Sequence, residues 1–129
     1  MGTGTGIGRV RGLGSAKSGA HHWWHQRLTA GSNLLLMSWF VVSLLRLPSL
    51  DYNIVTQWLS SPLAALPMAL LVISVFYHFR LGLQVFIEDY VHDEALKLAS
   101  IVLLNFYVIG AGAIALFCIL KIALGGAAA

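Results

Sequence analysis

Charged side chains are scarce in this sequence. Asp, Glu, Lys and Arg make up 10% of the 129 residues, while 58% are hydrophobic. A soluble domain carries roughly a quarter charged residues, so this chain has too few to cover a water-exposed globule. The composition therefore excludes both an ordinary soluble domain and a disordered tail, and the length predicts a single domain.

Cysteine is almost absent as well. Cys118 is the one cysteine of the chain. A single thiol excludes a disulfide framework and a metal site built from cysteines alone.

What the sequence does contain is three long apolar runs. A helix needs about 20 apolar residues to cross roughly 30 Å of hydrocarbon. Three segments reach this length: Leu28–Leu47, Pro62–Ile87 and Ala95–Leu124. Because lipid offers the backbone no hydrogen-bond partners, such spans are helices. We predict an all-α membrane protein with three transmembrane helices, divided into an N-terminal segment (residues 1–27) and a membrane anchor domain (residues 28–129).

The basic residues predict the orientation. Six of the eight Lys and Arg residues lie before the first span or near the second connection, and these two regions share one side of a three-helix protein. The positive-inside rule then predicts a cytoplasmic N-terminus. This distribution accounts for the net charge of +3 by topology, so we expect no binding to nucleic acid.

Two motifs of the N-terminal segment resemble binding sites, but neither has the pattern of one. Its glycine-rich start, Gly2 to Gly8, has neither the dinucleotide-binding nor the phosphate-loop spacing, so we expect a flexible tail. The group His21, His22 and His25 lacks acidic or cysteine neighbours. Interleaved with two tryptophans, it favours an interfacial amphipathic segment over a metal site.

His78 is the most informative polar residue of the second span. It is expected about 13 Å below the cytoplasmic end, where an ionisable group usually faces the bundle interior or a functional site. Positions 78, 82, 85 and 89 form one helical stripe, which joins His78 to Gly82 and to Asp89 at the water boundary. Histidine is a normal axial ligand of haem iron, and glycine beside it leaves room for a porphyrin edge. A histidine that is only hydrogen-bonded to a neighbouring helix remains the alternative.

The number of histidines limits a haem site. A six-coordinate haem needs two axial ligands, and His78 is the one histidine at membrane depth. The second ligand would then come from another chain. Arg27 stands where the chain enters the membrane, either as a snorkelling residue or as the partner of a haem propionate. Arg80 shares a stripe with Gln84 and Glu88, and it pairs internally, contacts a partner or snorkels.

These residues resemble the hydrophobic membrane anchor, the D subunit, of succinate dehydrogenase (respiratory complex II), in its alphaproteobacterial form. The resemblance covers roughly residues 12 to 124. It is carried by His78, Gly82, Gln84 and Asp89-Tyr90, and by the segments Gly14-Ser15-Ala16 and His25-Gln26-Arg27-Leu28-Thr29-Ala30. Where some relatives have a tryptophan-rich stretch after the histidine, this chain has Phe79-Arg80.

The resemblance implies roles for four residues. His78 would be an axial ligand of haem b, shared with the companion cytochrome b556 subunit, and Arg27 would lie near the propionates. Tyr90 would hydrogen-bond a ubiquinone carbonyl, and Asp89 would border the same pocket. The resemblance also implies an iron–sulfur subunit, a flavoprotein subunit and surrounding membrane lipid as partners, in electron transport linked to the tricarboxylic acid cycle.

Two other functions remain open at this stage. A fumarate reductase anchor would run the same chemistry in reverse, and a small membrane protein without a cofactor would use the deep histidine for packing. We expect the bacterial inner membrane rather than the mitochondrial one, because no long presequence is seen.

Overall fold

The protein is almost entirely helical. A computed structural model describes residues 19–125, and its elements are α2 (Gly19–Leu45), α3 (Tyr52–Leu59), α4 (Pro62–Tyr90) and α5 (Glu94–Gly125). The glycine-rich start and the Gly14-Ser15-Ala16 segment lie outside the described residues. The three long helices are each long and apolar enough to cross a membrane. The predicted fold class, an all-α membrane protein with three spans, is confirmed.

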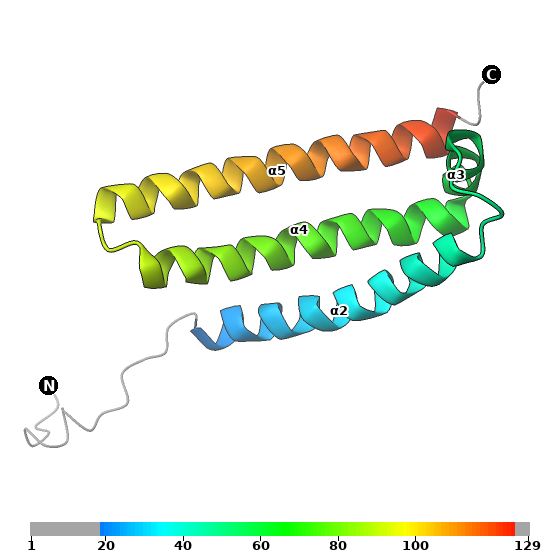
Figure 1. Cartoon of the computed structure of the whole chain (residues 1–129). Helices are drawn as coiled ribbons and strands as arrows, with labels where there is room; N and C mark the ends of the chain where they lie inside the picture. The colour runs from blue at the N-terminus through cyan, green and yellow to red at the C-terminus, as the bar shows by residue number, and fades with distance from the viewer. Residues whose placement is uncertain (1–18, 126–129) are drawn as a thin grey trace, which may run out of the picture.

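The three long helices lie side by side in a single layer with α4 in the middle (Figure 1). α4 packs against both α2 and α5, whereas α2 and α5 make no contact with each other within residues 19–125. The Gly19 end of α2 and the α4–α5 connection lie at one end of the layer, and α3 lies at the other (Figure 1). Such an open layer leaves two broad helix faces without a partner among residues 19–125.

The first helix begins earlier than its apolar pattern predicts. α2 starts at Gly19, whereas the predicted span begins at Leu28. Residues 19–27 contain no proline, and Tyr77 of α4 holds this part of the helix, because its hydroxyl lies 2.8 Å from His25 Nδ1. The segment expected at the membrane surface is therefore the start of α2.

The first connection also differs from the expected loop. Residues 52–59 form the short helix α3, which follows Asp51 in extended conformation. Its apolar residues Ile54, Val55, Trp58 and Leu59 recur with helical spacing on one side. Leu59 is buried with Ala65 and Ile119. Burial of this apolar side against α4 and α5 explains why a segment between two spans becomes helical.

The second connection is short, as the sequence predicts. Residues 91–93 join α4 to α5, and the backbone N–H of Leu96 donates to Asp93 Oδ1 at 2.8 Å, which caps the start of α5. Ile87 of α4 is buried with Leu104 and Val108 of α5. The short turn and this apolar cluster hold α4 and α5 together as an antiparallel pair.

Most of the large apolar side chains nevertheless remain exposed. Four examples, each at least 70% exposed, are Leu34, Leu63, Leu103 and Ile109. No described side chain is completely enclosed. In water this would be a large apolar surface, but lipid tails and partner helices are its natural neighbours in a membrane. The fold is therefore consistent with a multi-pass membrane protein whose faces are covered by other molecules.

Candidate functional site

His78 projects from α4 toward α2, where its ring forms a hydrogen bond with a threonine side chain. His78 Nδ1 lies 2.9 Å from Thr29 Oγ1, and the His78 side chain is half-buried. Thr29 is the buried polar residue of the described chain. The hydrogen bond to a neighbouring helix, which was the alternative interpretation of this histidine, is therefore present, and its partner Thr29 was not identified from the sequence.

The hydrogen bonds of Thr29 favour one tautomer of His78. A hydroxyl has one proton, and that of Thr29 is directed at the His25 carbonyl oxygen at 2.8 Å, with the Gln26 carbonyl at 3.1 Å. With its proton used there, Thr29 Oγ1 is an acceptor for an N–H group at His78 Nδ1. In that tautomer Nε2 carries the lone pair, and no hydrogen bond engages it within residues 19–125. A neutral imidazole fixed at one nitrogen and free at the other is the form that binds a metal.

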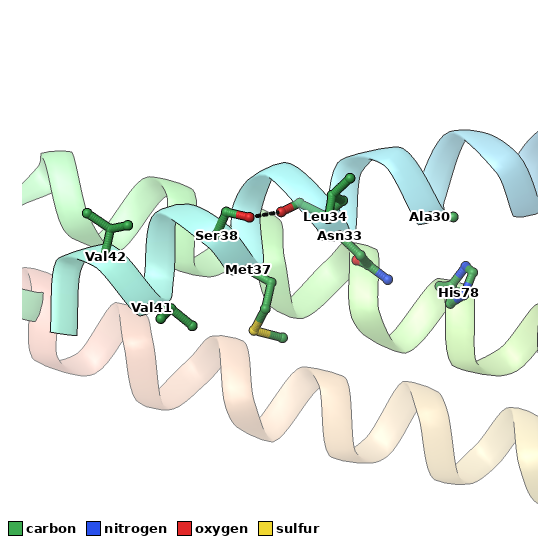
Figure 2. A pocket seen from close by; sticks show the side chains of 8 residues that line it. All are labelled: Ala30, Asn33, Leu34, Met37, Ser38, Val41, Val42 and His78. Atoms are coloured by element: carbon green, nitrogen blue, oxygen red, sulfur yellow. Dashed lines mark hydrogen bonds between the residues drawn. The ribbon is translucent and has the colours of Figure 1, made fainter. Parts of the chain in front are cut away.

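An open hollow lies beside this ring. Its volume is about 690 Å³, and it runs along α2, with His78 of α4 at the end near Ala30 (Figure 2). The lining is mostly apolar: Ala30, Asn33, Leu34, Met37, Ser38, Val41, Val42 and His78. Binding sites for cofactors commonly have volumes of about 300–1,000 Å³, an apolar lining and a few polar groups. The hollow therefore has the size and chemistry for a flat apolar group with one nitrogen ligand.

Gly82 has a different neighbour from the expected one. A Cβ at this position would lie 3.5 Å from Gln26 Nε2 of α2. Gly82 therefore shares the stripe of His78, as predicted, but it faces the Gln26 side chain rather than open space. The open space beside His78 lies instead along the surface of α2 around Ala30.

Arg27 lies on the α2 face that carries the hollow. Its spacing to Ala30 and Leu34, three and seven residues, puts the three side chains on one stripe. The Arg27 side chain is exposed, and its guanidinium carbon lies 5.0 Å from the ring centroid of Trp23. The tryptophan ring stabilises the cation by a cation–π interaction. Arg27 is thus a positive group at the Gly19 end of the hollow.

Asp89 and Tyr90 lie at the far end of α4 from the hollow. Both side chains are exposed, and they stand roughly 16 and 18 Å from His78 along the helix axis. Neither forms a side-chain hydrogen bond within the described chain. The ring of Tyr90 stacks on Phe86, with centroids 4.6 Å apart and planes at 26°. The candidate residues of α4 therefore form two separate groups, one at His78 and the other at Asp89 and Tyr90.

Arg80 pairs with a residue that the sequence reasoning missed. Its Nε donates to Asn105 Oδ1 of α5, which links α4 to α5 at membrane depth. Gln84 Nε2 donates to Glu88 Oε1 at 2.8 Å, so these two residues pair with each other and not with Arg80. Of the three possibilities for Arg80, internal pairing is the one observed, although its partner lies outside the expected stripe. A lone asparagine in an otherwise apolar span was the signal that could have indicated this contact.

The histidines at the start of α2 do not gather into a metal site. The ring centroids of His21 and His25 are 4.2 Å apart, and His25 Nδ1 is engaged by the Tyr77 hydroxyl. Within residues 19–125, no group of three His, Cys, Asp or Glu side chains is placed to hold a metal ion. His78 would therefore need a ligand from outside these residues to complete a six-coordinate iron.

Comparisons with known proteins identify the family of this chain. The family model described as "Succinate dehydrogenase/Fumarate reductase transmembrane subunit" matches residues 1–120. The chain is 37% identical to the succinate dehydrogenase hydrophobic membrane anchor subunit of Rickettsia bellii, over 78% of this chain and 81% of the relative. The corresponding subunit of Rickettsia conorii is 34% identical over 80% and 82%. The chain belongs to the succinate dehydrogenase/fumarate reductase transmembrane subunit family.

Proposed function

We propose that this chain is the membrane anchor subunit of a succinate:ubiquinone oxidoreductase, where it helps to bind haem b and to form the ubiquinone-reduction site. The observation that carries the proposal is the His78 ring, fixed at Nδ1 by Thr29 and bordering an apolar hollow, in a chain of this family. Relatives named as succinate dehydrogenase subunits favour this direction over fumarate reduction.

His78 is proposed as the residue of this chain that would hold haem b, through Nε2. Haem, when bound, supplies one-electron redox chemistry. The contribution of this chain is to hold the imidazole in the ligand tautomer through Thr29 and to exclude water with the apolar residues of α2. Since the described residues offer no second histidine beside the hollow, the companion cytochrome b556 subunit supplies the other ligand.

Arg27 is proposed as the partner of a haem propionate. The support is its position on the same α2 stripe as Ala30 and Leu34, at the end of the hollow nearer the water boundary. Its cation–π contact with Trp23 leaves the five guanidinium N–H groups free to donate to an anion. A carboxylate there would form a charge-assisted pair with the guanidinium.

Tyr90 and Asp89 are proposed as residues of the ubiquinone pocket. The Tyr90 hydroxyl would donate a hydrogen bond to a quinone carbonyl and stabilise the negative charge that develops during reduction. The Asp89 carboxylate would pass protons toward the same oxygen. Their exposure supports this role, because a second subunit must complete any pocket built at this end of α4.

The single helix layer supports a role in a larger assembly. Its two uncovered faces fit the companion anchor subunit and lipid, while the iron–sulfur subunit and then the flavoprotein subunit would lie beyond the Tyr90 end. Electrons from succinate would reach the quinone from that side. We therefore place the Gly19 end of α2 and the Tyr90 end of α4 on the cytoplasmic side of a bacterial inner membrane, in line with the distribution of basic residues.

Purification of the tagged chain in mild detergent tests the assignment to a complex. We expect a flavoprotein, an iron–sulfur protein and a second small membrane subunit to co-purify with it, together with succinate-dependent ubiquinone reduction. The tagged chain, when it is expressed and purified without the companion subunit, should show no haem spectrum, because one of the two proposed haem ligands is then missing. A chain that purifies alone from its native membrane, without these partners, would contradict the proposal.

Thr29→Val tests the role of the threonine in holding His78. Valine keeps the branched shape but removes the acceptor of the His78 Nδ1–H group. Loss of such a partner typically costs a metal site about 10- to 100-fold in affinity, so we expect haem to dissociate more readily from the purified complex. Haem retention during dilution and the visible spectrum measure the effect.

Thr56→Val provides the matched control. The Thr56 hydroxyl donates to the Tyr52 carbonyl within α3, far from His78 along the fold. This variant should retain haem as the unmodified complex does. Equal haem loss in both variants would mean that the threonine hydroxyls act on general stability and that Thr29 has no particular effect on His78.

A further inference from the structure

A pair of aromatic rings on α4 extends the proposed quinone site. Phe86 and Tyr90 are one helical turn apart, and their rings stack with centroids 4.6 Å apart at 26°. We infer that Phe86 is a positioning residue, which holds the Tyr90 phenol so that its hydroxyl is presented to the quinone carbonyl. This inference rests on the proposed role of Tyr90.

The two rings lie on a face of α4 that no other described helix covers. Phe86 and Tyr90 fall about 80° and 120° around the helix from His78. His78 and Gly82 are on the side toward α2, and Phe76 and Ile87 pack with the α5 side. Phe86 and Tyr90 are 54% and 69% exposed, between these two contacts. The uncovered face of α4 begins beside His78, which lines the hollow. The stacked rings of Phe86 and Tyr90 therefore lie on the same side of the helix layer as the hollow.

Tyr90 needs such support because of its place in the chain. It is the last residue of α4, and the Val91 that follows is already extended. A helix end frays readily, and a tyrosine ring there is free to change its χ1 rotamer. No hydrogen bond holds its hydroxyl within the described residues. The Phe86 ring is then the contact that restricts the phenol, and offset stacking is a favoured arrangement for two aromatic rings.

The predicted effect appears in quinone affinity. If Phe86 raises the fraction of molecules whose phenol is in the competent orientation, its loss lowers that fraction and raises the apparent KM in proportion. From the usual strength of an aromatic pair, Phe86→Leu should raise the KM for ubiquinone about 2- to 10-fold. The kcat at saturating quinone should change little, and succinate oxidation with a soluble dye should be unchanged. Phe86→Tyr, which keeps the ring, should restore the original KM.

Phe79→Leu is the matched control in the assembled complex. Phe79 is an exposed phenylalanine of the same helix, but its ring lies 6.4 Å from that of Tyr107 and does not contact Tyr90. This variant removes an equal ring and should leave the KM for ubiquinone unchanged. A similar rise in KM for Phe79→Leu would overturn the inference, since the effect would then come from any ring lost from this face.

A double-mutant cycle with Tyr90→Phe separates the inference from the proposed function. Tyr90→Phe keeps the stack but removes the hydroxyl, so Phe86→Leu should have no further effect in that background. If Tyr90→Phe lowers activity and Phe86→Leu has its full effect in both backgrounds, the positioning role is wrong while the proposed function stands. If Tyr90→Phe alone is without effect, the proposed role of Tyr90 fails, and the inference falls with it. Should Phe86→Leu reduce assembly, Phe86→Met, whose unbranched side chain adapts better to an irregular gap, is measured in its place under the same criteria.

Discussion

His78→Ala is expected to abolish stable haem binding in the assembled complex. The substitution removes Nε2, the proposed ligand, which the Thr29 hydrogen bond to Nδ1 leaves available. Loss of an outer partner alone costs a metal site about 10- to 100-fold, so loss of the ligand itself should exceed about 100-fold in haem affinity. The haem content and the reduced-minus-oxidised spectrum of the purified complex measure the result. Succinate oxidation with a soluble dye should persist, because we propose that it takes place in the flavoprotein subunit.

His92→Ala is the control for this experiment. His92 is exposed in the short connection between α4 and α5, outside the helical stripe of His78. Its removal should leave the haem spectrum unchanged. A normal haem spectrum in the complex carrying His78→Ala would show that the ring only packs against α2, and the assignment of His78 as a ligand would have to be abandoned.

Tyr90→Phe is expected to reduce ubiquinone reduction about 10- to 100-fold, which is the usual value of a hydrogen bond to a charged acceptor. The substitution deletes one oxygen and keeps the ring stacked on Phe86, so the fold of α4 should not change. Because the hydroxyl is proposed to stabilise charge that develops during reduction, kcat should fall along with kcat/KM. Parallel assays with ubiquinone and with a soluble dye measure the effect, and the dye reaction should be retained.

Tyr107→Phe serves as the comparison for Tyr90→Phe. Tyr107 lies on α5, is 59% exposed and contacts the Phe79 ring. Removal of its hydroxyl should leave both assays unchanged. If Tyr90→Phe lowers the dye and quinone reactions equally, the tyrosine affects assembly or the succinate site, and a role at the quinone is excluded.

The local features of this protein could be predicted from its sequence. Each apolar run is at least as long as a membrane crossing requires, so the spans ending in Leu45, Tyr90 and Gly125 were predictable to within a few residues at these ends. The stripe that joins His78 to Asp89 follows from the constant rotation per residue of a helix. These are properties of one helix at a time, and they depend only on neighbouring residues.

The contacts between helices were not predictable in the same way. Thr29 and His78 are 49 positions apart, and Arg80 and Asn105 are 25 apart. Which of them meet depends on how far each helix extends, how it is rotated and where its turns align with those of its neighbour. The early start of α2 and the helix α3 also depend on contacts between helices. Tyr77 of α4 holds the start of α2, and the cluster around Leu59 buries one side of α3.

The sequence by itself determined that the chain crosses a membrane three times and that a histidine lies deep in its second span, because apolar length and helical period are local quantities. The tertiary structure alone decided that this histidine meets Thr29 and keeps Nε2 free. It also decided that Gly82 faces Gln26 and that Arg80 reaches Asn105. The physical reason is that a polar side chain within an apolar layer is stabilised by a partner on another helix, and the register between helices determines which partner is within hydrogen-bonding distance.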